Sequence, residues 1–218
     1  NFEKLNSGAV KIAVEARDKT NAEHVCVAGG ISYWTWTGKK PSLADLKKTV
    51  TTQAQIMAES GADLLMLEMM IDIEQMMVTY EAAKSSGLPI WLGLACNLNF
   101  QGEVCLLGGD SLEQALVSLP NDKPDVINVM HTEVSHVIPA LNCLKSVWHK
   151  PVGVYAHSGK TINGKWTFND VISPMDYYQH ALSWIDQGVK FIGGCCGVNV
   201  KHISLLNDKL IKHSGLEG

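Results

Sequence analysis

Two adjacent cysteines near the C-terminus are flanked by glycine on both sides. Cys195 and Cys196 follow the apolar run 189–192 and lie within the pentapeptide GGCCG at 193–197. Neighbouring side chains of a regular strand point to opposite faces, so both thiols can face one object only where the backbone bends. Glycine permits such a bend. Because thiolates are preferred ligands of zinc, the pair predicts a metal site at the end of a strand.

Histidines end two other apolar runs. His131 closes the run 125–131, and His157 closes the run 151–157. A catalytic zinc has three protein ligands and an open fourth position, so the cysteine pair and one imidazole form a chemically suitable Cys₂His set. A thiol bound to such a cation loses its proton at neutral pH and becomes a nucleophile. The alternative for each histidine is a buried, hydrogen-bonded side chain, and His157 is also a candidate to line a substrate pocket.

Other candidate residues also stand where apolar runs end. An unpaired buried carboxylate is costly, so a functional role for Glu68 is favoured over a structural ion pair with a loop. Tyr155 is either a substrate contact or an aromatic residue of the barrel wall. Gly29, at the end of the first run, is a candidate substrate contact. Trp34 and Trp36 follow it and either stack on a ligand or plug the mouth of the fold.

The elements that position these residues can be read from hydrophobic patterning. Short apolar runs without polar alternation, typical of strands covered on both faces, occupy 24–30, 62–69, 89–96, 125–131, 151–157 and 189–196. Amphipathic segments of helical length occupy 4–19, 42–60, 72–86, 111–119, 133–147, 172–187 and 198–213. Ser42 and the pair Asp110-Ser111 are candidate helix caps. The chain therefore predicts a strand and helix unit repeated about six times, at the roughly 30-residue spacing of a βα unit.

Strict alternation of strands and helices predicts an α/β fold with a parallel sheet, either closed as an eight-stranded barrel or open and doubly wound. We favour the (β/α)₈ barrel of the TIM type. Such a barrel usually takes about 250 residues, and here six strands follow a leading helix, as if the first two units were absent. No phosphate-binding glycine fingerprint follows the run 24–30, which counts against a dinucleotide fold. In both architectures, ligands bind at the C-terminal ends of the strands.

The composition is that of one globular domain spanning 1–218, with 46% hydrophobic and 18% charged residues. A formal charge of −4 and scattered basic residues argue against nucleic-acid binding and favour a small-molecule ligand. Six cysteines without the spacing of a disulfide scaffold fit a reducing compartment, and the cytoplasm is the expected location. No run of 18 uncharged apolar residues occurs, so no membrane association is expected.

Four motifs, in this order, resemble the homocysteine S-methyltransferases: VAGGI at 27–31, DLLMLE at 63–68, VYAHSGK at 154–160 and GGCCG at 193–197. The resemblance implies a zinc-dependent (β/α)₈ barrel that transfers a methyl group to the thiol of homocysteine or a related thiol. In that family, the cysteine pair and a third cysteine, from an Asn-Cys pair at the end of the sixth strand, hold the zinc. The resemblance also implies that Glu68 meets the ammonium group of the substrate. It assigns no methyl donor.

The chain departs from the family pattern in three places. Met130 and His131 stand where the family has the Asn-Cys pair, so His131 is the expected third ligand and the site carries one negative charge less. Ala156 and His157 replace a Pro-Asn pair beside the metal position. The first two βα units of the family have no counterpart, which would leave two sheet edges exposed and favour association, including homo-oligomers.

The favoured function is methyl transfer to a zinc-activated thiol. One alternative is a diverged or truncated barrel that binds zinc or a small thiol without turnover. Another is a different metal-assisted reaction, such as hydrolysis on a Cys₂His site, which predicts a water in the open position and no preference for thiols.

Overall fold

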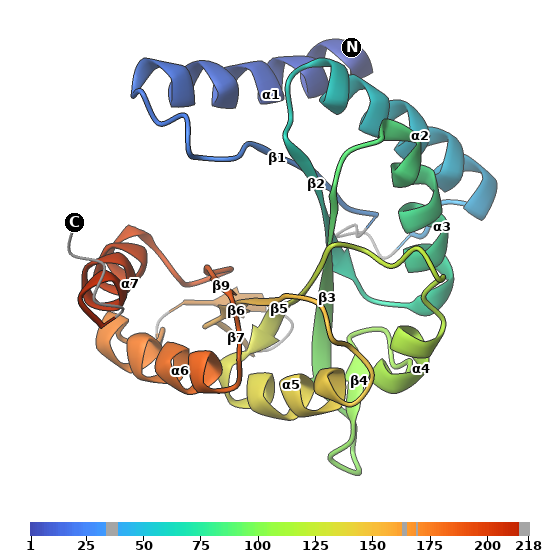
Figure 1. Cartoon of the computed structure of the whole chain (residues 1–218). Coiled ribbons are helices and arrows are strands. Elements are labelled where there is room, and N and C mark those ends of the chain that lie inside the picture. The colour runs from blue at the N-terminus through green and yellow to red at the C-terminus, as the bar shows by residue number, and fades with distance from the viewer. Residues whose placement is uncertain (34–38, 163–164, 169, 214–218) are drawn as a thin grey trace.

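The computed structural model describes residues 1–33, 39–162, 165–168 and 170–213. Its centre is a curled sheet in which six parallel strands run in the order β1-β2-β3-β5-β6-β9 (Figure 1). These strands are β1 (Ala28–Ile31), β2 (Leu64–Met70), β3 (Ile90–Leu98), β5 (Val126–Glu133), β6 (Val152–His157) and β9 (Phe191–Ile192). The parallel α/β sheet expected from the sequence is confirmed.

Helices cover the convex face of the sheet, as Figure 1 shows. They are α1 (Phe2–Lys19), α2 (Leu43–Glu59), α3 (Ile73–Ala83), α4 (Leu112–Val117), α5 (Val137–Lys145), α6 (Pro174–Asp186) and α7 (Val200–His213). Smaller elements are η1 (Lys84–Ser86), η2 (Val134–His136), β4 (Val104–Leu106), which pairs antiparallel with β3, and the hairpin β7 (Lys160–Ile162) and β8 (Lys165–Thr167). None of the described helices combines the length and the apolar character needed to cross a membrane.

Side-chain caps fix where several helices begin. The hydroxyl of Ser42 accepts a hydrogen bond from the backbone N–H of Asp45 at the start of α2. Ser111 caps α4 in the same way through Gln114. Each cap satisfies an N–H group that the first turn of a helix leaves without a partner. Both helix starts agree with the caps expected from the sequence.

The two faces of the sheet carry different side chains. Leu65 and Leu67 of β2 are fully buried among the hydrophobic core residues. Met66 and Glu68 alternate with them and line a cavity on the other face. Because large side chains occupy both faces, the strands show no polar alternation in sequence, as expected for a covered parallel sheet.

The sheet ends at β1 and β9, and within the described part of the chain no strand pairs with their outer edges. Helices α1 and α7 flank the two ends of the curl (Figure 1). The structure is therefore a curled half-barrel of six strands with its helices, which confirms the TIM-barrel type with about six βα units.

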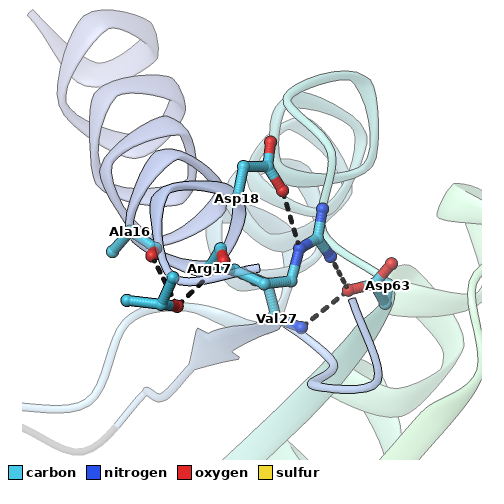
Figure 2. A network of polar contacts seen from close by, with 6 residues as sticks. Ala16, Arg17, Asp18, Val27 and Asp63 are labelled. Atoms are coloured by element: carbon cyan, nitrogen blue, oxygen red, sulfur yellow. Dashed lines mark hydrogen bonds and ion pairs between the residues drawn. The ribbon is translucent and has the colours of Figure 1, made fainter. Parts of the chain in front are cut away.

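A polar network holds the end of α1 to the sheet, and Figure 2 shows its geometry. Arg17, the chain's one arginine, places Nη1 3.0 Å from Oδ2 of Asp63, at the entrance to β2. The same carboxylate oxygen accepts a hydrogen bond from the backbone N–H of Val27 at 2.6 Å. The guanidinium also contacts Asp18 at 3.1 Å through Nε. One carboxylate thus joins the leading helix, the approach to β1 and the start of β2.

Two strand boundaries differ from the sequence expectation by more residues than the other strand boundaries do. The first strand begins at Ala28 rather than at residue 24. The last strand contains only Phe191 and Ile192, so Cys195 and Cys196 lie beyond it. Successive glycines follow Ile192, and they lack the β-branched or aromatic side chains that favour extended pairing.

Candidate metal and substrate site

The C-terminal ends of β5 and β9 bring three ligand atoms together. Nδ1 of His131 lies 3.4 Å from Sγ of Cys195 and 3.9 Å from Sγ of Cys196. The two sulfurs are 3.9 Å apart. Among the described residues, these three form the one group of histidine, cysteine or acidic side chains that could hold a metal ion. The side chains predicted as metal ligands thus converge.

The spacing of these atoms fits zinc. Bonds of about 2.3 Å to sulfur and about 2.0 Å to nitrogen, at tetrahedral angles, put two sulfurs about 3.8 Å apart and a sulfur and a nitrogen about 3.5 Å apart. The observed separations of 3.9, 3.4 and 3.9 Å lie close to these values. Three protein ligands leave a fourth tetrahedral position open, as in catalytic zinc sites.

The backbone around the cysteine pair turns both thiols to one side. Cys195 N–H donates to the carbonyl of Ala156 at 3.0 Å, and the carbonyl of Cys196 accepts from the N–H of Ser158 at 2.8 Å. Gly197 then adopts φ +82°, and a Cβ there would collide with the carbonyl oxygen of Ser158. The last glycine of the motif is therefore required both by its left-handed conformation and by the close approach of the β6 end.

His131 reaches the cysteines from an irregular strand end. Its φ is +41°, an unusual value for a residue with a Cβ, and the pairing of β5 with β6 shifts register between Met130 and Glu133. Thr132, fully buried, stabilises this bend through its hydroxyl, which donates to the Met130 carbonyl and accepts from the Cys96 N–H. The register shift is the local reason why the imidazole leaves the regular alternation of the strand.

Protonation of the metal-free site follows from its burial. Burial, followed by the nearby His157, lowers the pKa of His131 to about 4, so the imidazole is neutral at physiological pH and its lone pair is available. Burial, followed by the neighbouring Cys196, raises the pKa of Cys195 to about 12. A bound cation acts in the opposite direction and deprotonates a coordinating thiol. The thiolate form at this site thus depends on a metal.

A cavity of about 500 Å³ adjoins the cysteine loop on the concave face of the sheet. Its wall includes Glu68, Asn128, Tyr155 and Gly194. Burial raises the pKa of Glu68, and the Tyr155 hydroxyl partly opposes that shift. The hydroxyl is buried and has no well-formed hydrogen bond with the described residues. The cavity therefore offers a half-buried carboxyl and a phenol beside the candidate metal site.

The structure separates the remaining predicted site residues. Gly29 does not reach the cavity, since a Cβ there would lie 2.8 Å from Sδ of Met57 in the helix layer. The neighbouring Gly30 faces the site, because its Cβ position is 3.4 Å from Oε2 of Glu68. The ring of His157 lies 4.6 Å from that of His131, centroid to centroid, but it is not a member of the three-residue ligand group. Trp34 and Trp36 lie outside the described residues.

Gly93 and Asn128 also lie near the site, and of these two only Gly93 was not singled out from the sequence. Gly93 lies where an added Cβ would be 2.5 Å from the Tyr155 hydroxyl, so its missing side chain makes room for the phenol. Asn128 is 2% exposed and lines the cavity. An amide inside an apolar run was a readable signal for Asn128. The glycine gave no comparable signal, because its partner lies on a different strand.

The chain is similar to known proteins of one family. The family model for homocysteine S-methyltransferase matches residues 1–210. Homocysteine S-methyltransferase 2 of Arabidopsis thaliana is 24% identical over 196 residues, which cover 87% of this chain and 58% of that protein. Selenocysteine Se-methyltransferase of Brassica oleracea is also 24% identical, and the match covers 87% of this chain and 56% of that protein. The chain thus spans under three fifths of the length of these curated relatives.

The fold has a solved counterpart. The apo form of the homocysteine methyltransferase MmuM from Escherichia coli superposes with a TM-score of 0.75 at 20% identity, covering 95% of this chain and 73% of that chain. A metallated form of the same enzyme gives the same TM-score at 18% identity. With the family model matching nearly the whole sequence, the chain belongs to the homocysteine S-methyltransferase family.

Proposed function

We propose that this chain transfers a methyl group to the thiol of homocysteine, or of a related small thiol, at a zinc site formed by His131, Cys195 and Cys196. The convergence of one imidazole and two thiols within 4.8 Å carries the proposal. Relatives named for methyl transfer to homocysteine and to selenocysteine support the same class of acceptor.

The zinc ion, when bound, supplies a Lewis acid that stabilises the acceptor thiol as a thiolate at neutral pH. The protein ligands leave one position for that sulfur. In the transfer, a sulfur lone pair forms the new bond to the methyl carbon, and the bond between the methyl carbon and the donor breaks with its electron pair staying on the donor. The proton of the thiol leaves to solvent when the acceptor binds.

The cavity beside the three metal ligands orients the substrate. The Glu68 carboxyl faces the same cavity as Tyr155, and an ammonium group placed between them would favour the ionised carboxylate. We assign Glu68 to the amino group of the acceptor and Tyr155 to orienting that carboxylate. His157 lies beside His131 but is not assigned to the ligand set.

A histidine in place of a third cysteine changes the charge of the site. Two thiolates would neutralise a bound zinc ion, so the complex with an acceptor thiolate would carry one net negative charge, against two for a site with three cysteines. A less negative site would hold the thiolate more firmly and make it a weaker nucleophile. This favours donors in which the methyl group is bonded to a positively charged atom that leaves easily. We propose this donor chemistry without naming the donor.

The working form of the domain is a complete barrel. The edges of β1 and β9 pair with no strand among the described residues, and we infer that they accept two further βα units, which would close the single domain and the wall of the cavity. Whether they come from the same polypeptide or from a second copy is decided by the oligomeric state. The six free cysteines fit a reducing compartment, and we propose the cytoplasm.

Metal analysis and X-ray absorption spectroscopy test the proposed function. We expect one zinc per chain and a change in the zinc spectrum on addition of homocysteine, with an added sulfur neighbour near 2.3 Å. Homoserine, which has a hydroxyl in place of the homocysteine thiol, is the matched control and should leave the spectrum unchanged. If the spectrum of the zinc-loaded chain does not change when homocysteine is added, thiol activation is refuted. If homocysteine binds but no methyl group is transferred, the chain is a barrel that binds the thiol without turnover.

A further inference from the structure

Met130 adjoins both a metal ligand and a residue of the cavity wall. It precedes His131 in β5 and pairs in register with Tyr155 of β6. Its side chain crosses toward β2, where Sδ accepts a hydrogen bond from the backbone N–H of Met69 at 2.9 Å. Met130 is 3% exposed. The side chain of Met130 therefore contacts the end of the strand that carries Glu68, while its backbone is bonded to that of the metal ligand His131.

Both strand ends joined by this sulfur have an uncommon conformation. Met69 has φ +56° and His131 has φ +41°. Each lies at a register shift, between Leu67 and Met70 on β2 and between Met130 and Glu133 on β5. A residue with a Cβ is strained in this region, so surrounding contacts must stabilise both turns.

Other contacts hold the neighbouring backbone groups but leave the Met69 N–H to the sulfur. The hydroxyl of Tyr33 accepts from the N–H groups of Ile71 and Asp72 at 2.9 and 3.2 Å. The hydroxyl of Thr132 donates to the Met130 carbonyl at 2.8 Å. The turn after Glu68 therefore begins at an N–H whose acceptor is a thioether.

Simple core packing does not account for this geometry. An apolar side chain of the same size would fill the space, but it would leave the part-buried Met69 N–H without this acceptor, which is unfavourable. The sulfur is also closely seated, because a Cβ on Gly93 would lie 3.1 Å from it and 2.5 Å from the Tyr155 hydroxyl. The position thus requires an acceptor as well as volume.

We propose that Met130 is a positioning residue whose sulfur fixes the turn after Glu68 and couples it to the strand end that presents His131. This inference rests on the proposed function, since Glu68 and His131 are the residues positioned. The role of the thioether is to accept a hydrogen bond from the Met69 N–H. A side-chain amide oxygen could fill the same role, because it also accepts a hydrogen bond.

Three variants separate the acceptor from the bulk. Met130→Leu removes the acceptor and keeps the volume, and Met130→Gln restores an acceptor oxygen on a side chain of similar length. Met76→Leu makes the same Met to Leu change at a fully buried position of α3 and serves as the control. Met130→Ile provides a second apolar variant in case Met130→Leu does not fold.

The first readout is hydrogen exchange of the Met69 amide, followed by NMR. We expect exchange to be about tenfold faster in Met130→Leu, corresponding to the loss of one hydrogen bond, and close to wild type in Met130→Gln and Met76→Leu. The second readout is the visible spectrum of the chain loaded with Co²⁺ alone. Its bands should shift in Met130→Leu and return in Met130→Gln.

Equal protection of the Met69 amide in Met130→Leu and wild type would overturn the proposal, as would equal effects of Leu and Gln on both readouts. Neither measurement needs turnover. A wild-type chain that shows the expected exchange and Co²⁺ results but ignores homocysteine would instead refute the proposed function and leave the coupling between the two turns in place.

Discussion

Nδ1 of His131 lies 3.4 Å from Sγ of Cys195, although the two residues are 64 positions apart in the sequence. Parallel strands bring their C-terminal ends to one edge, so residues from distant repeats meet there. The contact joins β5 to the loop after β9, and its chemistry depends on both partners.

Replacing His131 by alanine should remove one of three zinc ligands. We expect zinc affinity to fall by at least about 100-fold, because loss of a direct ligand costs more than loss of a supporting contact. Competition with a chromogenic chelator measures the affinity. His180→Ala, at an exposed helix position, is the control and should retain full affinity. Undiminished affinity in His131→Ala would remove this residue from the site.

The metal-free chain should lose stability as the pH falls. The pKa of His131 is about 4 in the folded chain and 6.5, its ordinary value, in the unfolded chain. As the pH falls, the unfolded chain therefore binds the proton first, and the free energy of unfolding declines from pH 6.5 toward pH 4. After allowance for partial exposure, we expect a contribution of about 1–2 kcal/mol. Urea unfolding at several pH values should show a flatter profile for His131→Gln, and parallel profiles would contradict the assignment.

Adding a methyl group at Gly93 should displace Tyr155. The new Cβ would lie 2.5 Å from the phenol oxygen and 3.0 Å from the backbone carbonyl oxygen of Leu67, so the strand itself must shift. We expect Gly93→Ala to lose about 1–3 kcal/mol of unfolding free energy. Gly8→Ala in α1 meets nothing within 4 Å and should gain about 0.5–1 kcal/mol. Similar denaturation midpoints for the two variants would show that β3 accommodates the methyl group.

Of the two carboxylates that contact Arg17 in Figure 2, Asp63 should contribute more to the stability of the fold than Asp18. Asp63 accepts from both Val27 N–H and Arg17, whereas Asp18 contacts Arg17 alone at 60% side-chain exposure. We expect Asp63→Asn to cost about 1 kcal/mol and Asp18→Asn to cost about 0.2 kcal/mol. Thermal unfolding of the two variants checks the order, and a larger loss in Asp18→Asn would reverse our interpretation of the network.

Hydrophobic patterning was sufficient to predict the repeating elements. Fully buried residues such as Leu92, Leu94 and Ile127 form the continuous apolar runs that predicted strands. Ser42 and Ser111 predicted two helix starts because their hydroxyls cap the first turn. These signals are local, so they survive without knowledge of the partner elements.

The details of the site were harder to predict because they depend on contacts between strands. The left-handed turns at Met69 and His131 follow from register shifts, which no local pattern reveals. Gly29 and Gly30 are equivalent in sequence, and only the pairing of β1 with β2 decides that Gly30 approaches Glu68. The cysteine pair could be recognised early because its chemistry and its flanking glycines lie within one pentapeptide.

Trp91 forms part of the cavity wall with Glu68 and Tyr155, and its ring lies 4.4 Å from that of Phe191, centroid to centroid. Indole fluorescence responds to the polarity and dynamics of its surroundings. A molecule that enters this cavity would replace water next to the indole ring. The chain thus contains an intrinsic optical reporter, through which cavity filling can be followed without labels or turnover.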